Sequence, residues 1–282
     1  MWRTVALGVL LGSSLGLGHA ANYPSASIAD TLSPLGAKIP QQQCGVLQAT
    51  HIVLPQQGQQ QPLTMLQGWH QHPLAAFLNC FSLTTYSLEQ LACTQQGERG
   101  RAHCQLPQKR GEPATREIIF VPDQMGIAFN NSQRVVLPVS ASMGLFAHEI
   151  AHWLGFVDEY PMAKELAQNF CTGRYSHASL NIVVTNTEVV SKAELIALWQ
   201  RLPWRHAVVN WRDLATPTAN GYWRLGTVNT EQAEPPVGLY RAQTCDATSN
   251  FAWRPVNQFT PMQYYDVTTW PQIYLELVQR GY

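Results

Sequence analysis

Hydrophobic and polar positions in the first half of the chain predict several strands. Residues 51–54 and 117–121 are short runs of β-branched and other apolar residues, which are typical of strands. Two further apolar runs, 126–129 and 134–139, flank the polar sequence Asn-Asn-Ser-Gln and predict a β-hairpin. The first half of the protein is therefore expected to be rich in strands.

Two stretches carry apolar residues at helical spacing. Residues 74–93 are predicted to form a helix, although two adjacent threonines interrupt the pattern. A second helix is predicted at about 143–154, and Ser140 or Ser142 can cap it by accepting a hydrogen bond from an unpaired backbone N–H. Gly155 is expected to end this helix, because glycine tolerates the left-handed conformation in which helices often end.

Weaker patterns continue toward the C-terminus. Residues 163–170 and 270–279 resemble helices, and 180–184 resembles a strand. The sequence Ser-Lys-Ala-Glu at 191–194 is a capping box before a helix through Gln200, since each polar side chain can bind the other residue's backbone N–H.

The first 20 residues have the pattern of a secretory signal peptide. Arg3 supplies a positive charge, residues 5–17 are apolar with interspersed glycines, and residues 18–20 (Gly-His-Ala) suit a signal peptidase. The apolar run is shorter than the roughly 20 residues that a membrane-spanning helix needs. We therefore expect cleavage before Ala21, no stable membrane insertion afterwards, and a secreted or periplasmic protein.

Polar segments suggest how the mature chain is organised. Residues 21–43 are rich in Ser, Ala and Pro and end in three glutamines, which predicts an N-terminal arm or linker. A second glutamine run at 56–61 predicts a surface loop. A chain of 282 residues suits one large domain or two small ones, and we assign residues 44–282 to a single domain.

Composition narrows the classes of partner. Hydrophobic residues make up 45% of the chain, which is enough for a sizeable core, whereas charged residues make up only 13%. Lys plus Arg and Asp plus Glu are balanced at 18 each. Because strong positive charge is the usual mark of nucleic-acid binding, we expect no nucleic-acid partner.

The cysteine count indicates disulfide bonds. An even number of cysteines in an exported chain predicts three disulfides, although six cysteines allow 15 pairings. Cys93 with Cys104 is the favoured pair, because a short polar, glycine-containing segment separates them. A thiolate of Cys44 could instead block a metal site from the N-terminal arm, but a disulfide is the simpler interpretation. The cysteines are Cys44, Cys80, Cys93, Cys104, Cys171 and Cys245.

The strongest chemical signal is the sequence His-Glu-Ile-Ala-His at 148–152. His148 and His152 lie one helical turn apart, so both rings can reach a single metal ion. Glu149 points at an adjacent angle, from which it can hold a water molecule without binding the metal. If the chain reverses direction at Gly155, it comes back toward the two histidines, and Asp158 can supply the third ligand.

This stretch resembles the metzincin-type zinc proteases, with aspartate in place of their third histidine. The aspartate variant is similar to snapalysin, and the Asp-Glu-Tyr ending at 158–160 is also similar to bacterial IgA-cleaving metallopeptidases, although the spacing is one residue shorter here. The resemblance implies an α+β fold with a mixed sheet, an active-site helix and a C-terminal helix. It also implies a methionine-containing turn at 260–264, with Met262 beneath the metal, and an insertion at about 161–258.

The resemblance further implies an exported zinc-dependent endopeptidase that acts on proteins or peptides. His148, His152 and Asp158 would hold Zn²⁺, and Glu149 would be the general base that activates a water molecule. Tyr264, or with less support Tyr160, would stabilise the oxyanion. The alternative is a zinc-containing binding or structural module of the cell envelope that lacks turnover, for which an intact Glu149 has no obvious use.

Other residues offer competing ligands. Glu159 adjoins Asp158 and is the alternative third ligand. A gluzincin-like arrangement would instead use Glu188 or Glu194, although Glu194 is already explained by the capping box.

Two histidines and several tryptophans have simpler explanations than a binding role. His70 and His72 are expected in a polar turn, because two histidines rarely complete a metal site. Core packing is the commoner role of tryptophan, but a peptide- or glycan-binding groove is the alternative for four of them. These are Trp199, Trp204, Trp211 and Trp223.

Overall fold

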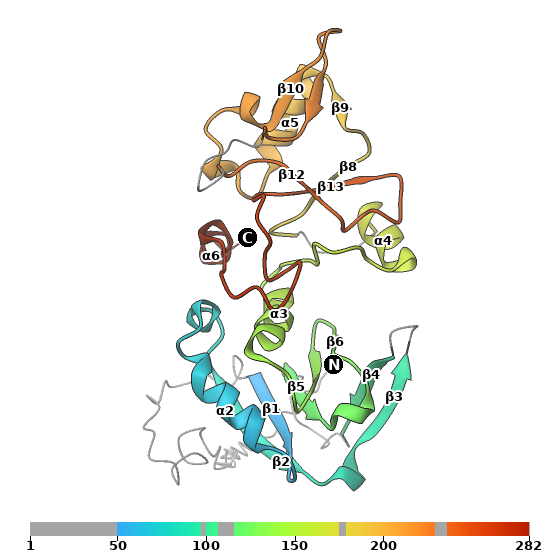
Figure 1. Ribbon diagram of the computed structural model, residues 1–282, viewed down its shortest axis with the longest axis vertical. Coiled ribbons are helices and arrows are strands. Elements are labelled where there is room, and N and C mark those ends of the chain that lie inside the picture. The colour runs from blue at the N-terminus through green and yellow to red at the C-terminus, as the bar shows by residue number, and fades with distance from the viewer. Residues whose placement is uncertain (1–49, 97–99, 107–115, 175–178, 229–235, 282) are drawn as a thin grey trace, which may run out of the picture.

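The computed structural model describes residues 50–96, 100–106, 116–174, 179–228 and 236–281. It has an α+β fold in which helix α3 (Met143–Trp153) lies between a lower half, built on one larger sheet, and an upper half of small sheets (Figure 1). The predicted signal peptide, the arm at 21–43 and Cys44 lie outside the described residues.

The larger sheet has five strands in the order β2-β1-β5-β7-β6. The first four strands are parallel, and only the edge strand β6 runs antiparallel to its neighbour β7. The predicted strands at 51–54 and 117–121 are confirmed as β1 and β5, and the predicted hairpin pairs β6 with β7. The strands are β1 (Thr50–Pro55), β2 (Phe81–Tyr86), β5 (Glu117–Val121), β6 (Phe129–Asn130) and β7 (Arg134–Pro138).

The predicted helix at 74–93 is wrong. This segment begins with a 3-10 turn at Pro73–Ala76, continues as strand β2 and reaches strand β3 (Ala92–Gln96) after a second turn. The two threonines and the flanking aromatic residues of β2 have the side chains that strands prefer, and pairing along all of β1 overrides the weak helical spacing.

Helix α2 (Gln60–Trp69) was missed, because its first residues belong to the glutamine run that we predicted to be a loop. Its apolar positions Leu63, Leu66 and Trp69 are buried against the sheet core. A parallel β1–β2 pair requires a crossover connection, and α2 supplies it.

Each face of the sheet has its own core. Alternate residues such as Ile52 and Phe120 pack with α2 and with Phe146 of α3. The residues between them, such as Val53 and Ile119, pack beneath the hairpin of β3 and β4 (Arg101–Gln105). The predicted Cys93–Cys104 disulfide is confirmed and joins the two strands of this hairpin.

The upper half contains two three-stranded antiparallel sheets, β12-β13-β8 and β10-β11-β9. The helix predicted after residue 191 is confirmed as α5, with both hydrogen bonds of its capping box. The helices predicted at 163–170 and 270–279 correspond to α4 and α6, and the strand predicted at 180–184 overlaps β8. The elements are α4 (Lys164–Cys171), β8 (Val183–Thr185), β9 (Val189–Val190), α5 (Lys192–Arg201), β10 (Ala215–Pro217), β11 (Trp223–Leu225), β12 (Tyr240–Ala242), β13 (Phe251–Arg254) and α6 (Gln272–Gln279).

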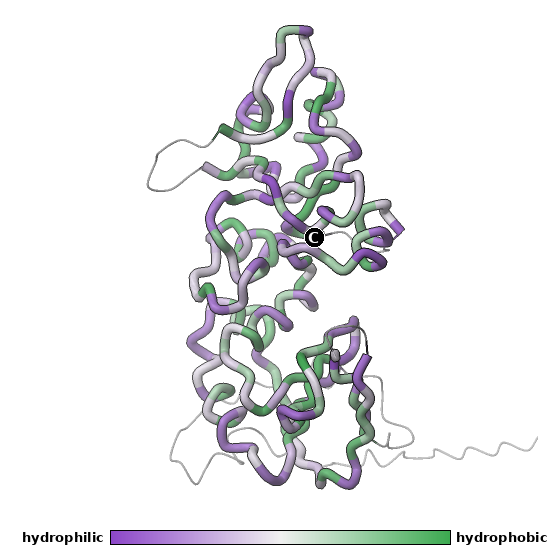
Figure 2. The backbone as a smooth tube through the Cα atoms, turned by 45° about the vertical axis from the view of Figure 1, so that its right-hand side comes forward, coloured by the Kyte–Doolittle hydropathy of each residue, from purple (hydrophilic) through white to green (hydrophobic). Residues whose placement is uncertain are grey.

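A second described disulfide, Cys171–Cys245, ties α4 to the loop after β12, and Cys80 is also disulfide-bonded. Disulfides are compatible with an oxidising compartment outside the cytosol. Hydrophobic and hydrophilic residues are mixed along the described chain (Figure 2), and none of its helices has the length and hydropathy needed to cross a membrane.

The tryptophans of the upper half serve mainly in packing. Trp204 is fully buried, and its indole N–H donates to the carbonyl of Gly238 at 2.8 Å. Trp199 is half-buried, with Arg205 stacked on its ring at 3.3 Å, and Trp211 packs edge-to-face on Trp223. These contacts favour the core-packing interpretation over an open groove.

Candidate metal centre

Helix α3 places the two histidines of the motif on one face. Ser142 caps the helix by accepting a hydrogen bond from the backbone N–H of Leu145 at 3.2 Å, so the second of the two predicted caps is the correct one. The side chain of Asn130, on edge strand β6, donates to the backbone carbonyl of Glu149 at 2.7 Å. This contact ties the middle of the helix to the sheet beside it.

The chain reverses at Gly155, as predicted. This residue has a φ of 101°, and a side-chain methyl group there would lie only 3.1 Å from the side chain of Leu180. A residue other than glycine would therefore be strained by its backbone conformation and crowded by its neighbour. The reversal returns the chain toward α3 and brings Asp158 to the two histidine rings.

The three predicted ligands converge. Oδ1 of Asp158 lies 3.1 Å from Nε2 of His148 and 3.2 Å from Nε2 of His152, and the possible ligand atoms of the three residues all lie within 4.8 Å of one another. Oδ1 is buried and has no hydrogen-bond partner among the described residues. A buried carboxylate oxygen without a hydrogen bond is costly, and a metal ion between the three side chains would satisfy it.

Each histidine is oriented through its other ring nitrogen. Nδ1 of His148 donates to the carbonyl of Pro261 at 2.8 Å, and Nδ1 of His152 donates to the carbonyl of Phe156 at 3.0 Å. A hydrogen on Nδ1 leaves Nε2 free to bind a metal, and such second contacts are usual around histidine ligands. The three residues can therefore hold a metal ion.

The acceptor for His148 belongs to the turn predicted at 260–264. The backbone N–H groups of Gln263 and Tyr264 both donate to the carbonyl of Thr260 at 3.0 Å, which closes the turn. Met262 within the turn is fully buried. The turn thus contacts the candidate metal centre through its backbone.

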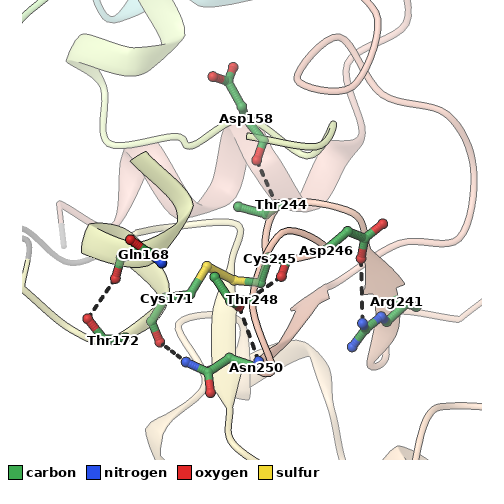
Figure 3. The surroundings of a disulfide bond; sticks show 10 residues. All are labelled: Asp158, Gln168, Cys171, Thr172, Arg241, Thr244, Cys245, Asp246, Thr248 and Asn250. Carbon is green, nitrogen blue, oxygen red and sulfur yellow. Dashed lines mark hydrogen bonds and ion pairs between the residues drawn. A yellow bond between two sulfur atoms is a disulfide. The ribbon is translucent and has the colours of Figure 1, made fainter. Parts of the chain in front are cut away.

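The main chain of Asp158 is also anchored (Figure 3). The hydroxyl of Thr244 donates to the Asp158 carbonyl at 2.7 Å, and the next residue, Cys245, is joined to Cys171 of α4. The upper half of the molecule therefore holds the third ligand in place against α3.

The competing ligands lie elsewhere. Glu159 faces away from the histidines and forms hydrogen bonds in the core, so the preference for Asp158 agrees with the geometry. Glu188 lies near Arg241, and Glu194 completes the capping box.

His72 caps the 3-10 turn at Pro73–Ala76 and stacks on Trp69; burial lowers its pKa to about 4.

Asp158 and His152 shift each other's pKa in opposite directions. Burial disfavours a charged Asp158, but His152 and His148 outweigh that effect and hold its pKa well below the usual range. Burial likewise opposes protonation of His152, but the carboxylates of Asp158 and Glu149 raise its pKa to about 9. The aspartate is therefore anionic at neutral pH, as a metal ligand must be, whereas a metal ion that binds here has to displace the proton on Nε2 of His152.

Tyr160 and Tyr264, both noted in the sequence, line the same cleft as the ligands, as does Tyr265. Tyr160 lies with its ring 6.2 Å from the ring of His148; burial, Asp158 and Glu149 raise the pKa of Tyr160 well above its usual value. Its hydroxyl is therefore protonated and can donate a hydrogen bond. Tyr264 is more exposed and packs edge-to-face against Phe259.

The cleft itself runs between the two halves of the molecule and has a volume of about 2160 Å³. Segment 126–132 of the lower half lines one side, and Met162, Leu166 and Phe170 of the upper half line the other. Glu149, which is 8% exposed, lies in the cleft wall next to the candidate ligands.

Gly144, in the first turn of α3, allows the chain after the turn at 260–264 to approach the helix. A methyl group at this position would overlap the backbone oxygen of Tyr265. We expect Gly144→Ala to reduce the free energy of unfolding by about 1–3 kcal/mol, as overpacking does, and to weaken metal binding. Urea unfolding and metal titration measure both effects.

Gly68→Ala is the matched control, because a methyl group there would meet only the flexible end of Met143 at 3.4 Å. Alanine in that helix is expected to leave stability unchanged or raise it by up to about 1 kcal/mol. Equal stabilities for the two variants would show that the contact between Gly144 and Tyr265 is unimportant.

No protein-family model and no curated protein matches the chain. The acceptors that orient the histidines, the carbonyls of Phe156 and Pro261, carried no signal in the sequence because any residue supplies a carbonyl.

Proposed function

We propose that this protein is an exported zinc metallopeptidase of metzincin type that hydrolyses proteins or peptides. The observation that carries the proposal is the position of Asp158 Oδ1, which is buried, lacks a hydrogen bond and lies 3.1 and 3.2 Å from the two Nε2 atoms. Zinc bonds of about 2.0–2.1 Å in tetrahedral geometry separate neighbouring ligand atoms by about 3.3 Å. The two separations between Asp158 Oδ1 and the histidine Nε2 atoms are consistent with that ion.

Three protein ligands leave one coordination position open, which is typical of catalytic rather than structural zinc. Zinc held by these three side chains would lower the pKa of a water molecule in the open position toward about 7, and it would polarise the substrate carbonyl. Glu149 lies beside the ligands without belonging to them, so its carboxylate accepts the proton of the attacking water. The same carboxylate then donates that proton to the leaving amine.

Tyr160 and Tyr264 are the candidates to stabilise the negative charge that develops on the carbonyl oxygen. The geometry favours Tyr160, because its ring stacks beside that of His148 in the cleft that Asp158 and Glu149 also line. Tyr264, which the sequence favoured, lines the cleft and remains the second candidate.

The cleft supports a polymeric substrate. Its volume of about 2160 Å³ exceeds the roughly 300–1,000 Å³ of pockets for small molecules. Its walls come from both halves of the molecule, so an extended polypeptide can cross the site with residues on both sides of the scissile bond. This arrangement suits an endopeptidase.

Chelation and reconstitution test the proposal. The chain from Ala21 onward should digest an unfolded protein substrate, lose this activity after dialysis against a chelator and regain it with one equivalent of Zn²⁺. Digestion that survives complete removal of metal would exclude the proposed mechanism.

A further inference from the structure

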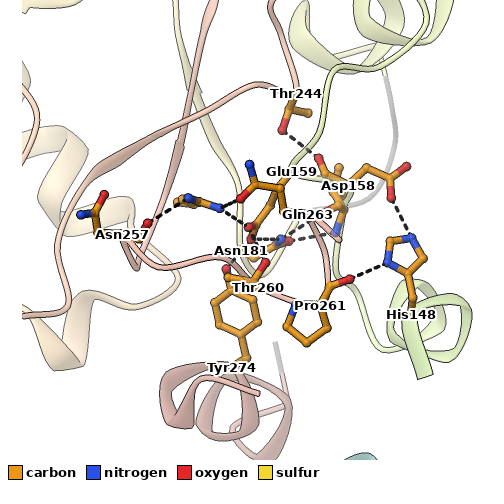
Figure 4. Close-up of polar contacts among 12 residues, drawn as sticks. His148, Asp158, Glu159, Asn181, Thr244, Asn257, Thr260, Pro261, Gln263 and Tyr274 are labelled. Atoms are coloured by element: carbon orange, nitrogen blue, oxygen red, sulfur yellow. Dashed lines mark hydrogen bonds and ion pairs between the residues drawn. The ribbon is translucent and has the colours of Figure 1, made fainter. Parts of the chain in front are cut away.

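Glu159 is fully buried, yet it carries a carboxylate that does not face the metal centre (Figure 4). Its oxygens accept hydrogen bonds from Asn181 at 2.8 Å, Thr260 at 2.6 Å and Arg254 at 2.9 Å, and from the hydroxyl of Tyr274. Four donors satisfy the carboxylate, as a buried charge requires.

The four donors come from distant parts of the chain. Asn181 lies before β8, Arg254 ends β13, Thr260 opens the turn at 260–264, and Tyr274 belongs to α6. The backbone of Glu159 adds two bonds: its N–H donates to the carbonyl of Met262 at 3.0 Å, and its carbonyl accepts from Gln243 at 3.1 Å. Glu159 thus joins five segments at one point.

This point connects two parts of the metal centre. On one side, Glu159 is covalently joined to Asp158, the third ligand. On the other side, Thr260 precedes Pro261, whose carbonyl accepts the hydrogen bond from His148. Arg254 strengthens the second connection, because the same guanidinium nitrogen also donates to the side chain of Gln263 at 2.6 Å.

We propose that Glu159 is the positioning residue of the metal centre. It fixes the Asp158 carboxylate and the Pro261 carbonyl in the positions from which they contact the two histidines. A carboxylate is needed because only an anion with two acceptor oxygens can accept from four donors at once and balance the charge of Arg254. The inference rests on the proposed metal-dependent function, but metal affinity tests it without any need for turnover.

Glu159→Gln is the sharpest variant, because it keeps the shape of the side chain and removes its charge and one acceptor oxygen. We expect Zn²⁺ affinity to fall by about 10- to 100-fold, as for other residues that orient metal ligands. Competition with a chromophoric chelator measures the affinity. The absorption spectrum of the Co²⁺-substituted protein should also change, since it reports the arrangement of the ligands.

Glu194→Gln is the control, because it removes a carboxylate from the capping box of α5 and has no contact with the metal centre. It should bind Zn²⁺ as tightly as wild type and give the wild-type Co²⁺ spectrum. Thr260→Val provides a second test if Glu159→Gln does not fold. Valine has nearly the same size as threonine but cannot donate the hydrogen bond to Glu159, so Zn²⁺ affinity should fall by about 3- to 10-fold.

Wild-type affinity and an unchanged Co²⁺ spectrum in folded Glu159→Gln would overturn the inference, as would wild-type affinity in Thr260→Val if only that variant folds. These results would leave the proposed function intact. Failure of the wild-type protein to bind Zn²⁺ would instead refute the proposed function together with this inference. Zinc binding by wild type without peptide hydrolysis would refute catalysis, and the affinity comparison would still decide the role of Glu159.

Discussion

Replacing Glu149 by glutamine is expected to lower kcat for peptide hydrolysis by about 10²- to 10⁴-fold, the usual contribution of a general base. The residue lies in the cleft wall, and Asp158, not Glu149, makes the close contacts with His148 and His152. Zinc content should therefore remain at one ion per chain. Steady-state kinetics on a cleaved peptide, together with metal analysis of the same sample, measure both quantities.

Glu165→Gln is the matched control for this variant. Glu165 is exposed in the first turn of α4 and does not line the cleft, so its replacement should change neither kcat nor zinc content. Loss of zinc from Glu149→Gln would contradict the assignment of Glu149 as a base that does not bind the metal. Full activity with zinc bound would contradict its role in proton transfer.

Removing the carboxylate of Asp158 should have the largest effect on metal binding. Zinc binding energies of about 10–16 kcal/mol shared among four ligands correspond to about 2.5–4 kcal/mol each. Asp158→Ala is therefore expected to weaken Zn²⁺ binding by about 10²- to 10³-fold, which is more than the effect expected for Glu159→Gln. Isothermal titration with Zn²⁺ measures the difference.

Asp266→Asn is the control, because Asp266 lines the same cleft but makes no described contact with the two histidines. It should leave Zn²⁺ affinity unchanged. Circular dichroism should accompany the titration of Asp158→Ala, because the variant also removes the anion next to buried His148 and half-buried His152. Unchanged affinity in a folded Asp158→Ala would show that another group is the third ligand.

Elements with strong local patterns were predictable from the sequence. The segments that form β1 and β5 consist of residues that strands favour, and a capping box marks the N-terminus of α5. The segment at 74–93 was not predictable in this way, because parallel pairing of β2 with β1 is a contact between distant residues. Apart from β8, the short strands of the upper half were missed for the same reason.

In the candidate site, too, the features set by local sequence were predictable, and those set by distant contacts were not. His148, His152 and Asp158 lie within one short stretch, so helical spacing and the glycine at 155 were enough to bring them together. The role of Glu159 was not predictable, because two adjacent acids look alike in sequence. Contacts with Arg254 and Tyr274, far along the chain, decide which acid faces the histidines and which supports them.

The most direct test of zinc-dependent catalysis by Glu149 is cleavage of a diverse peptide library by the wild-type protein and by Glu149→Gln, each shown beforehand to contain one zinc ion. We expect cleavage by the wild type alone, with the cleaved sequences defining the bond preference. If neither protein cleaves any peptide although both hold zinc, the protein is a metal-containing binding module and the assignment of catalysis to Glu149 is wrong.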